Sequence, residues 1–214
     1  NTIIGGLAGD ALTDADNNTA LGYLALSAET NNNGNTAIGA ESLKVQNAGG
    51  GGDARNTAVG FLAGAAVTTG VQNTLIGSLA GDALTDADKN VAVGYQALSS
   101  DTLGSNSTAI GRGALFAQNF TTATDSFNTA VGADAGNQVT TGTENTLIGG
   151  LSGDAITTGI RNVAVGSYAL STNQQGDQSV AVGHGALFTQ NPSGNADMNN
   201  TAVGYRAMRE STTG

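Results

Sequence analysis

The chain has 214 residues and a formal net charge of −10, and only 11% of its residues are charged, against roughly 25% in an average soluble domain. The negative charge argues against binding to nucleic acid, because lysine and arginine supply the affinity for phosphates. Without cysteine, neither a disulfide framework nor a thiolate metal site can form. No apolar run approaches the ~20 residues that span a bilayer, so we expect no direct membrane insertion.

One short phrase recurs along the whole chain. It reads NTIIGGLAG from Asn1, NTAVGFLAG from Asn56 and NTLIGSLAG from Asn73. The fifth residue of every copy is a glycine, here called the marker glycine. The marker glycines are Gly5, Gly22, Gly39, Gly60, Gly77, Gly94, Gly111, Gly132, Gly149, Gly166, Gly183 and Gly204. They are 17 or 21 residues apart, and three spacings of 17 with one of 21 make a higher period of 72 residues.

A fixed period of about 20 residues is typical of a solenoid. We therefore predict a single all-β domain over residues 1–214, a parallel β-solenoid whose twelve turns are here called coils. Three super-repeats of the 72-residue period cover residues 1–72, 73–144 and 145–214. Because neither end carries an atypical capping repeat, we interpret the chain as a fragment of a longer fibre.

Each coil is expected to contain one short strand directly before its marker glycine. The residue before the glycine is Ile or Val in eleven of twelve copies, with Leu21 as the exception. Ala stands one position earlier in nine copies, and Thr one position before that in nine. Such alternation predicts a strand, and stacked coils should pair these strands in parallel, about 4.8 Å apart. We expect the Ile and Val side chains to face inward and form an aliphatic ladder.

Two further positions are expected to be structural. The marker glycine should supply either a positive φ or a place where neighbouring backbones come close. An asparagine stands four residues before it in ten copies, with Ser107 and Ser179 in the others. This residue either forms a ladder of amide hydrogen bonds between coils or simply favours a turn.

The three 21-residue coils carry longer return loops, ESLKVQNAGGGGDARN, GALFAQNFTTATDSFN and GALFTQNPSGNADMNN. We expect these loops to project on one side of the rod, either as a binding surface or as a cover for a flank or a neighbouring chain. The candidate receptor-binding residues in them are Lys44, Arg55, Phe116, Phe120, Phe127, Phe188 and Pro192.

Two aspartate-rich loops, DALTDADNN and DALTDADKN, place Asp14, Asp16, Asp86 and Asp88 where Ca²⁺ could bind. The alternative is a set of solvated turn residues, because the third equivalent loop, DAITTGIRN, keeps only its first aspartate. His184 is the only histidine, so a nucleophile–base pair or a zinc centre lacks parts. We therefore predict no catalytic residue and no cofactor other than Ca²⁺.

The copies NTAIG, NTAVG, STAIG and SVAVG, each followed by a small residue three positions later, resemble the head repeats of trimeric autotransporter adhesins. They are also similar to the repeat shafts of bacteriophage tail fibres. The resemblance covers all twelve repeats and implies a left-handed parallel β-roll that assembles as a side-by-side homotrimer. Repeats of 17 and 21 residues are longer than is usual for adhesin heads, so the return loops are longer too.

The leading functional hypothesis is a structural and adhesive fibre segment, extracellular, on a cell surface or a virion. Its partners would be its own copies in the homotrimer and a host-surface glycan or matrix protein bound by the projecting loops. One alternative is an ice-binding solenoid, because the Thr of each strand would form a row, interrupted by Val91, Val163 and Val180. Another is a fibre-borne glycan depolymerase, which requires an acidic groove.

Overall fold

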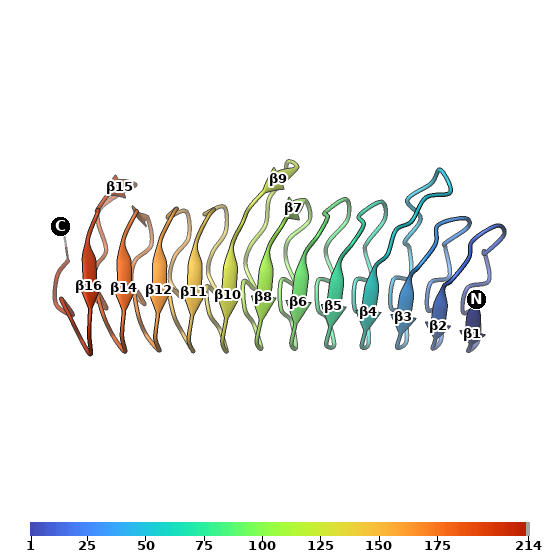
Figure 1. The fold of residues 1–214 in the computed structure, drawn as a ribbon, viewed down its shortest axis with the longest axis horizontal. Coiled ribbons are helices and arrows are strands. Elements are labelled where there is room, and N and C mark those ends of the chain that lie inside the picture. Colours follow the sequence, from blue (N-terminus) through green and yellow to red (C-terminus); the bar gives the residue numbers. More distant parts are fainter. Residues whose placement is uncertain (213–214) are drawn as a thin grey trace.

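The computed structural model describes residues 1–212 as a rod of stacked coils, shown in Figure 1. Twelve three-residue strands pair in parallel into one sheet that follows the chain order. They are β1 (Thr2–Ile4), β2 (Thr19–Leu21), β3 (Thr36–Ile38), β4 (Thr57–Val59), β5 (Thr74–Ile76), β6 (Val91–Val93), β8 (Thr108–Ile110), β10 (Thr129–Val131), β11 (Thr146–Ile148), β12 (Val163–Val165), β14 (Val180–Val182) and β16 (Thr201–Val203). No membrane-crossing helix is found among residues 1–212. The last two residues of the predicted third super-repeat, 213–214, lie outside the described residues.

The long return loops add small second sheets. In the second super-repeat β7 (Gly104–Ser105) pairs with β9 (Thr124–Asp125), and in the third β13 (Gly176–Asp177) pairs with β15 (Ala196–Asp197). The first super-repeat has a single bridge at the equivalent place, between Asn33 and Asp53. In Figure 1 the three long loops rise beyond their neighbours on the same side of the rod.

The strand register places like residues on like. Between β2 and β3, Thr19 pairs with Thr36 and Ala20 with Ala37. The same alignment continues across the 21-residue coils, where Thr36 pairs with Thr57. The predicted all-β parallel solenoid of twelve coils is therefore confirmed.

The prediction that Ile and Val face inward is wrong. In every strand of the twelve-stranded sheet except the first, β1, the middle residue is buried and is usually Ala, whereas the residues on either side of it point outward. Ile76 and Ile110 are 39% and 38% exposed. The lumen is narrow and is already filled from the opposite wall by buried Ala and Leu side chains, so the strand side contributes mostly Ala. We call the outward residues before the marker glycines the aliphatic file. It comprises Ile4, Leu21, Ile38, Val59, Ile76, Val93, Ile110, Val131, Ile148, Val165, Val182 and Val203.

The marker glycines combine a positive φ with a close backbone approach. Their φ angles lie between +125° and +140°. A Cβ on Gly94 would lie 2.6 Å from the carbonyl carbon and oxygen of Gly111 in the next coil. A side chain at these positions would push adjacent coils apart, so both of the anticipated reasons for glycine apply. The segment that follows is a left-handed turn, in which Leu24 and Leu26 have φ values of 55° and 53°.

Core packing explains why Leu replaces Ala in β5. The Leu75 side chain spans two coils whose opposite wall carries glycine. A Cβ on Gly64 would lie 2.7 Å from Leu75 Cδ1, and one on Gly81 would lie 2.7 Å from Leu75 Cδ2. Leu147 fills the same space beside Gly136 and Gly153 one super-repeat later. In the second and third super-repeats a large core residue on the strand side therefore faces glycines on the opposite wall.

The repeated asparagines form a ladder of hydrogen bonds between coils. The backbone N–H of Asn73 donates to Asn56 Oδ1 at 2.9 Å, and the N–H of Asn90 donates to Asn73 Oδ1 at 2.9 Å. The Asn73 Nδ2 group donates to the Ala87 carbonyl at 2.7 Å. Of the two readings of this position, the structure supports the amide ladder. Each buried amide satisfies backbone groups that would otherwise lack partners.

Candidate binding surfaces

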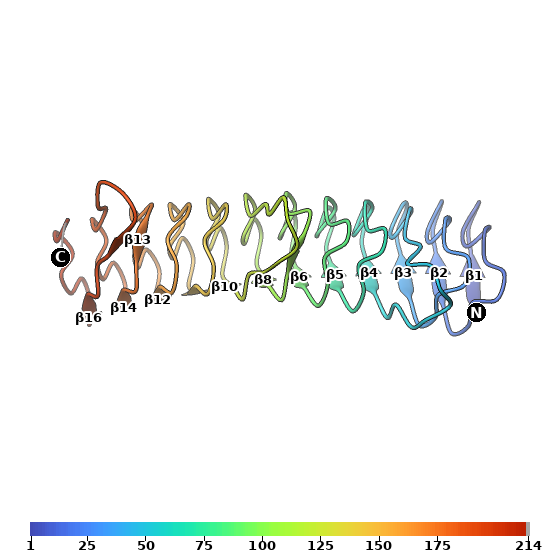
Figure 2. The same cartoon turned by 90° about the horizontal axis from the view of Figure 1, so that it is seen from above.

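The sheet forms a flat face without charge. Each of its twelve strands directs two side chains outward, which makes 24 outward positions, and all of them hold Thr, Val, Ile or Leu. The strands lie along one side of the rod in Figure 2. In a chain with a net charge of −10, this distribution leaves the charged residues to the turns and return loops.

The Phe120 side chain is buried, contrary to the prediction that it belongs to an exposed receptor-binding loop. It is 6% exposed, and its backbone N–H donates to the buried Asp101 Oδ1 at 3.0 Å. Its ring lies over Gly104, where an added Cβ would be 2.7 Å from Phe120 Cδ2. The Phe120 ring therefore covers the buried Asp101 side chain. The sequence does not reveal this role, because it does not show that Gly104, which has no side chain, lies beneath the ring.

The other candidates in the first two long loops are spread along the rod. Lys44 pairs with Glu41 at 2.8 Å, and Arg55 pairs with Asp53 at 2.5 Å. Phe127 is 57% exposed, and Phe116, at the other end of the same loop, is half-buried. The structure therefore leaves these four side chains as separate surface features and does not assemble them into one site.

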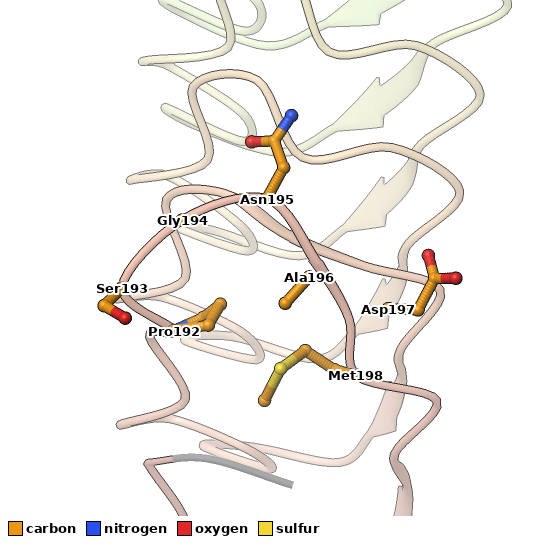
Figure 3. A pocket seen from close by; sticks show the side chains of 7 residues that line it. All are labelled: Pro192, Ser193, Gly194, Asn195, Ala196, Asp197 and Met198. Atoms are coloured by element: carbon orange, nitrogen blue, oxygen red, sulfur yellow. The ribbon is translucent and has the colours of Figure 1, made fainter.

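The third long loop encloses a hollow of about 420 Å³, shown in Figure 3. Pro192, Ala196 and Met198 line its inside, whereas Asn195 and Asp197 point away from it. Asn195 Oδ1 accepts a hydrogen bond from the Thr158 hydroxyl at 3.0 Å, and Asp197 Oδ1 accepts one from Gln178 Nε2 at 2.7 Å. These bonds tie the loop to earlier coils, and none of the seven lining residues in Figure 3 directs a charged side chain into the hollow.

The aspartate-rich loops do not converge on a cation. Asp14 and Asp16 are exposed. Asp86 Oδ1 accepts a hydrogen bond from the Thr69 hydroxyl at 2.6 Å, and Asp88 Oδ1 accepts one from the Val71 N–H at 2.8 Å. Within residues 1–212 no three His, Cys, Asp or Glu side chains gather closely enough to share a metal ion. Asp86 and Asp88 connect neighbouring coils.

A second concave site lies on the side of the third super-repeat, and we call it the aromatic pocket. Its volume is about 200 Å³, and its lining residues are Tyr168, His184, Gly185, Phe188, Arg206 and Arg209. Of these, only Phe188 was a candidate from sequence. The signal that was overlooked is the spacing: Tyr168, Gly185 and Arg206 are each the second residue after a marker glycine, in three successive coils.

The carboxyl of Asp154 has a raised pKa. Burial raises the pKa of this carboxyl above its ordinary value of 3.8, and the charge of Asp134 adds to the rise. A hydrogen bond from the Ser171 hydroxyl opposes the shift. Asp154 lies outside both hollows described above.

Comparisons with protein-family models, with curated proteins and with solved structures find no match to this chain. The surface features that bear on function are the sheet face, the loops and the two hollows. Of these, the sheet face extends along all twelve coils and is the most regular.

Proposed function

We propose that this chain is a structural and adhesive segment of an extracellular fibre on a cell surface or a virion. Three copies pack side by side as left-handed rolls through the sheet face, and the remaining surface attaches to a host glycan or matrix protein. The handedness and the number of copies come from the resemblance to adhesin head repeats. The structure supports the proposal through the chemistry of the sheet face.

The aliphatic file is the observation that carries this proposal. Soluble monomers rarely expose contiguous apolar patches of more than a few hundred Å². Here Ile, Val or Leu points outward in every coil, and the neighbouring outward residue is an uncharged Thr or Val. A second copy of the same face offers a matching surface with the same coil spacing. Packing of copies along the rod would bury the file without leaving a charge unpaired.

The mass of the protein in solution tests this assembly. Light scattering is expected to give about 63 kDa, three times the 21.0 kDa of one chain. Replacing Val93 and Ile110 with glutamate should reduce the mass to that of one chain, because assembly would bury unpaired charges at the centre of the face. The control variant is Lys89→Glu in an exposed return loop, which changes charge without touching the face. A wild-type mass of 21 kDa would refute the assembly.

The outward threonines favour ice binding as a second candidate function. Nine of the twelve strands begin with Thr, on the same flat face as the aliphatic file. Parallel strands repeat such a row about every 4.8 Å along the rod. Thermal hysteresis should then be measurable and should fall when Thr74 and Thr108 are replaced with lysine. An assembled protein with no thermal hysteresis would exclude this candidate and leave the fibre proposal intact.

A further inference from the structure

We propose that the aromatic pocket binds a carboxylated sugar, so that a short acidic saccharide is the ligand class recognised by the third super-repeat. This inference rests on the proposed attachment function and gives it a specific site. The pocket is built by three successive coils of one chain, so it does not require a second copy to be complete.

Aromatic rings form the wall of the pocket. The Tyr168 and His184 ring centroids are 5.8 Å apart at 66°, and Tyr168 lies 6.4 Å from Phe188. His184 stacks on Tyr205 with centroids 5.5 Å apart and an angle of 22° between the rings. Tyr168 and Tyr205 are 40% and 70% exposed, so parts of both rings can contact a ligand. Rigid aromatic faces offer large contact area at small conformational cost, which suits the apolar C–H face of a pyranose.

Two guanidinium groups provide the positive charge. Arg206 lies 5.0 Å from the Tyr205 ring centroid, and Arg209 lies 5.0 Å from that of Phe188. Arg209 also pairs with the exposed Glu210 at 2.6 Å, whereas Arg206 has no carboxylate at salt-bridge distance within residues 1–212. A guanidinium presents a planar pair of donors that matches a carboxylate. The Arg206 side chain is therefore the group that we expect to bind the sugar acid.

The equivalent surface of the second super-repeat shows that this combination is local. Seventy-two residues earlier, Gln96 replaces Tyr168, Asp134 replaces Arg206 and Asn137 replaces Arg209. The position of His184 is taken by Arg112, which forms an ion pair with Asp134. The positive charge is thus neutralised within the second super-repeat, and only Phe116 remains of the aromatic wall.

The first super-repeat lacks the site altogether. The equivalents of Tyr168, His184, Phe188 and Arg206 are Leu24, Ala40, Lys44 and Leu62, and Lys44 pairs with Glu41. Phe61, at the position of Tyr205, is the one aromatic ring among these equivalent residues. The equivalent surface therefore has a different set of side chains in each of the three super-repeats. Only the third unites aromatic faces with an unneutralised guanidinium, in a chain whose net charge is −10.

The overall negative charge narrows the ligand class. A long polyanion such as nucleic acid would be repelled by the acidic surface along the rod. A saccharide of two or three units can place its carboxylate at Arg206 and its ring against Tyr168 without extending over the acidic loops. A pocket of about 200 Å³ accommodates part of such a ligand and leaves the remainder in solvent.

Isothermal titration calorimetry of the assembled protein with trigalacturonate and with 3′-sialyllactose tests the proposal. The matched neutral probes are fully methyl-esterified trigalacturonate and lactose. We expect at least one carboxylated probe to bind, and to bind at least tenfold more tightly than its neutral counterpart. No heat from either acidic probe at millimolar concentration, or equal binding of the neutral probes, would overturn the proposal.

A pair of matched variants locates the site. Arg206→Gln should weaken binding of the acidic probe at least tenfold, whereas Arg112→Gln, at the equivalent position to His184 one super-repeat earlier, should leave it within twofold. Equal effects of the two variants would place the binding elsewhere. Because the pocket lies within one chain, the monomeric double variant of Val93 and Ile110 should also bind. Failure of the assembly test and failure of the saccharide test are therefore separate results.

Discussion

Gln118 and Gln46 occupy equivalent positions in the second and first super-repeats, and both side chains are fully buried. Gln118 Nε2 donates to Asp101 Oδ2 at 2.6 Å and to the Ser107 hydroxyl at 2.9 Å. Its Oε1 accepts from Asn128 Nδ2 at 2.9 Å. The side-chain amide of Gln46, in contrast, forms no hydrogen bond with the described residues.

The difference arises from the residue that ends the amide ladder before each 21-residue coil. In the second super-repeat this residue is Ser107, whose side chain is too short to reach the next asparagine, and Gln118 bridges the gap between Ser107 and Asn128. Gln190 does the same between Ser179 and Asn200 in the third super-repeat. Each bridge continues the polar ladder across a longer coil.

The first super-repeat keeps asparagine at this point. Asn35 Oδ1 accepts directly from the Asn56 N–H at 3.1 Å, so the ladder needs no bridge. Gln46 is then superfluous, and Asn35 Nδ2 and Glu29 Oε2 also lack protein partners. A buried polar group stabilises the fold only when its set of hydrogen bonds is complete. The same glutamine is therefore expected to contribute oppositely in the two super-repeats.

The largest expected difference is between two leucine substitutions. Gln118→Leu should lower the free energy of unfolding by about 3 kcal/mol or more, because it removes one hydrogen bond each from the buried Asp101, Ser107 and Asn128 side chains. Gln46→Leu should change it by less than about 1 kcal/mol, since a methyl-ended side chain replaces an amide that bonds to no protein group. Guanidinium chloride unfolding at a fixed protein concentration, combined with hydrogen exchange of the affected coils, measures both. Equal losses would remove the basis of the comparison.

Exchanging the ladder residues should give an intermediate effect. Ser107→Asn places an amide donor opposite the Gln118 donor, and the free energy of unfolding should fall by about 1–3 kcal/mol. Asn35→Ser removes the Oδ1 acceptor of the Asn56 N–H, but it also removes an unpartnered amide donor and introduces the hydroxyl that lets the glutamine bridge, as Gln118 does in the second super-repeat. Because these changes oppose each other, its net cost should be about 1 kcal/mol or less. The same unfolding assay applies, and a larger loss for Asn35→Ser than for Ser107→Asn would contradict the bridging role of the glutamine.

The smallest expected effect on stability concerns Asp154, a partly buried carboxylate with fewer hydrogen bonds than Asp101. Asp101 accepts two backbone N–H groups and the Gln118 amide, whereas the Asp154 side chain accepts from the Ser171 hydroxyl. Because the pKa of Asp154 is raised in the folded state, its ionisation costs stability as pH rises through that pKa. Asp154→Asn should therefore raise the thermal midpoint slightly at neutral pH and leave it unchanged below about pH 3. Ser171→Ala, which removes the opposing hydrogen bond, should enlarge the pH dependence. A pH-independent difference between Asp154→Asn and wild type would contradict this assignment.

Much of the scaffold could be predicted from the repeat. The strands lie where the alternation before each marker glycine placed them, and the amide ladder was one of the two anticipated roles of asparagine. Which side of each strand faces the core could not be predicted in the same way. Thr–Ala–Val has no charged residue to mark the solvent side, and the β-branched residues were assigned to the core. The structure puts them outside because the lumen admits only Ala beside the Leu residues of the opposite wall.

The candidate sites were less predictable than the scaffold. Phe120 was a candidate receptor-binding residue, but it covers Asp101 over a glycine that leaves room for its ring. The Gln118 bridge had a detectable signal, because serine replaces asparagine eleven residues before Gln118 and again before Gln190. The aromatic pocket draws on three coils and becomes visible in the sequence only when residues at equivalent coil positions are aligned.

By itself, the sequence determined the period, the number of coils and the register of the parallel strands, because coils of equal length must stack with equivalent residues in line to pair their backbones. Only the tertiary structure decided which side of the sheet is buried, which glutamine completes the ladder and where aromatic rings and arginines meet. These outcomes depend on the width of the lumen and on distances between side chains of different coils, which a repeat unit read in isolation does not contain.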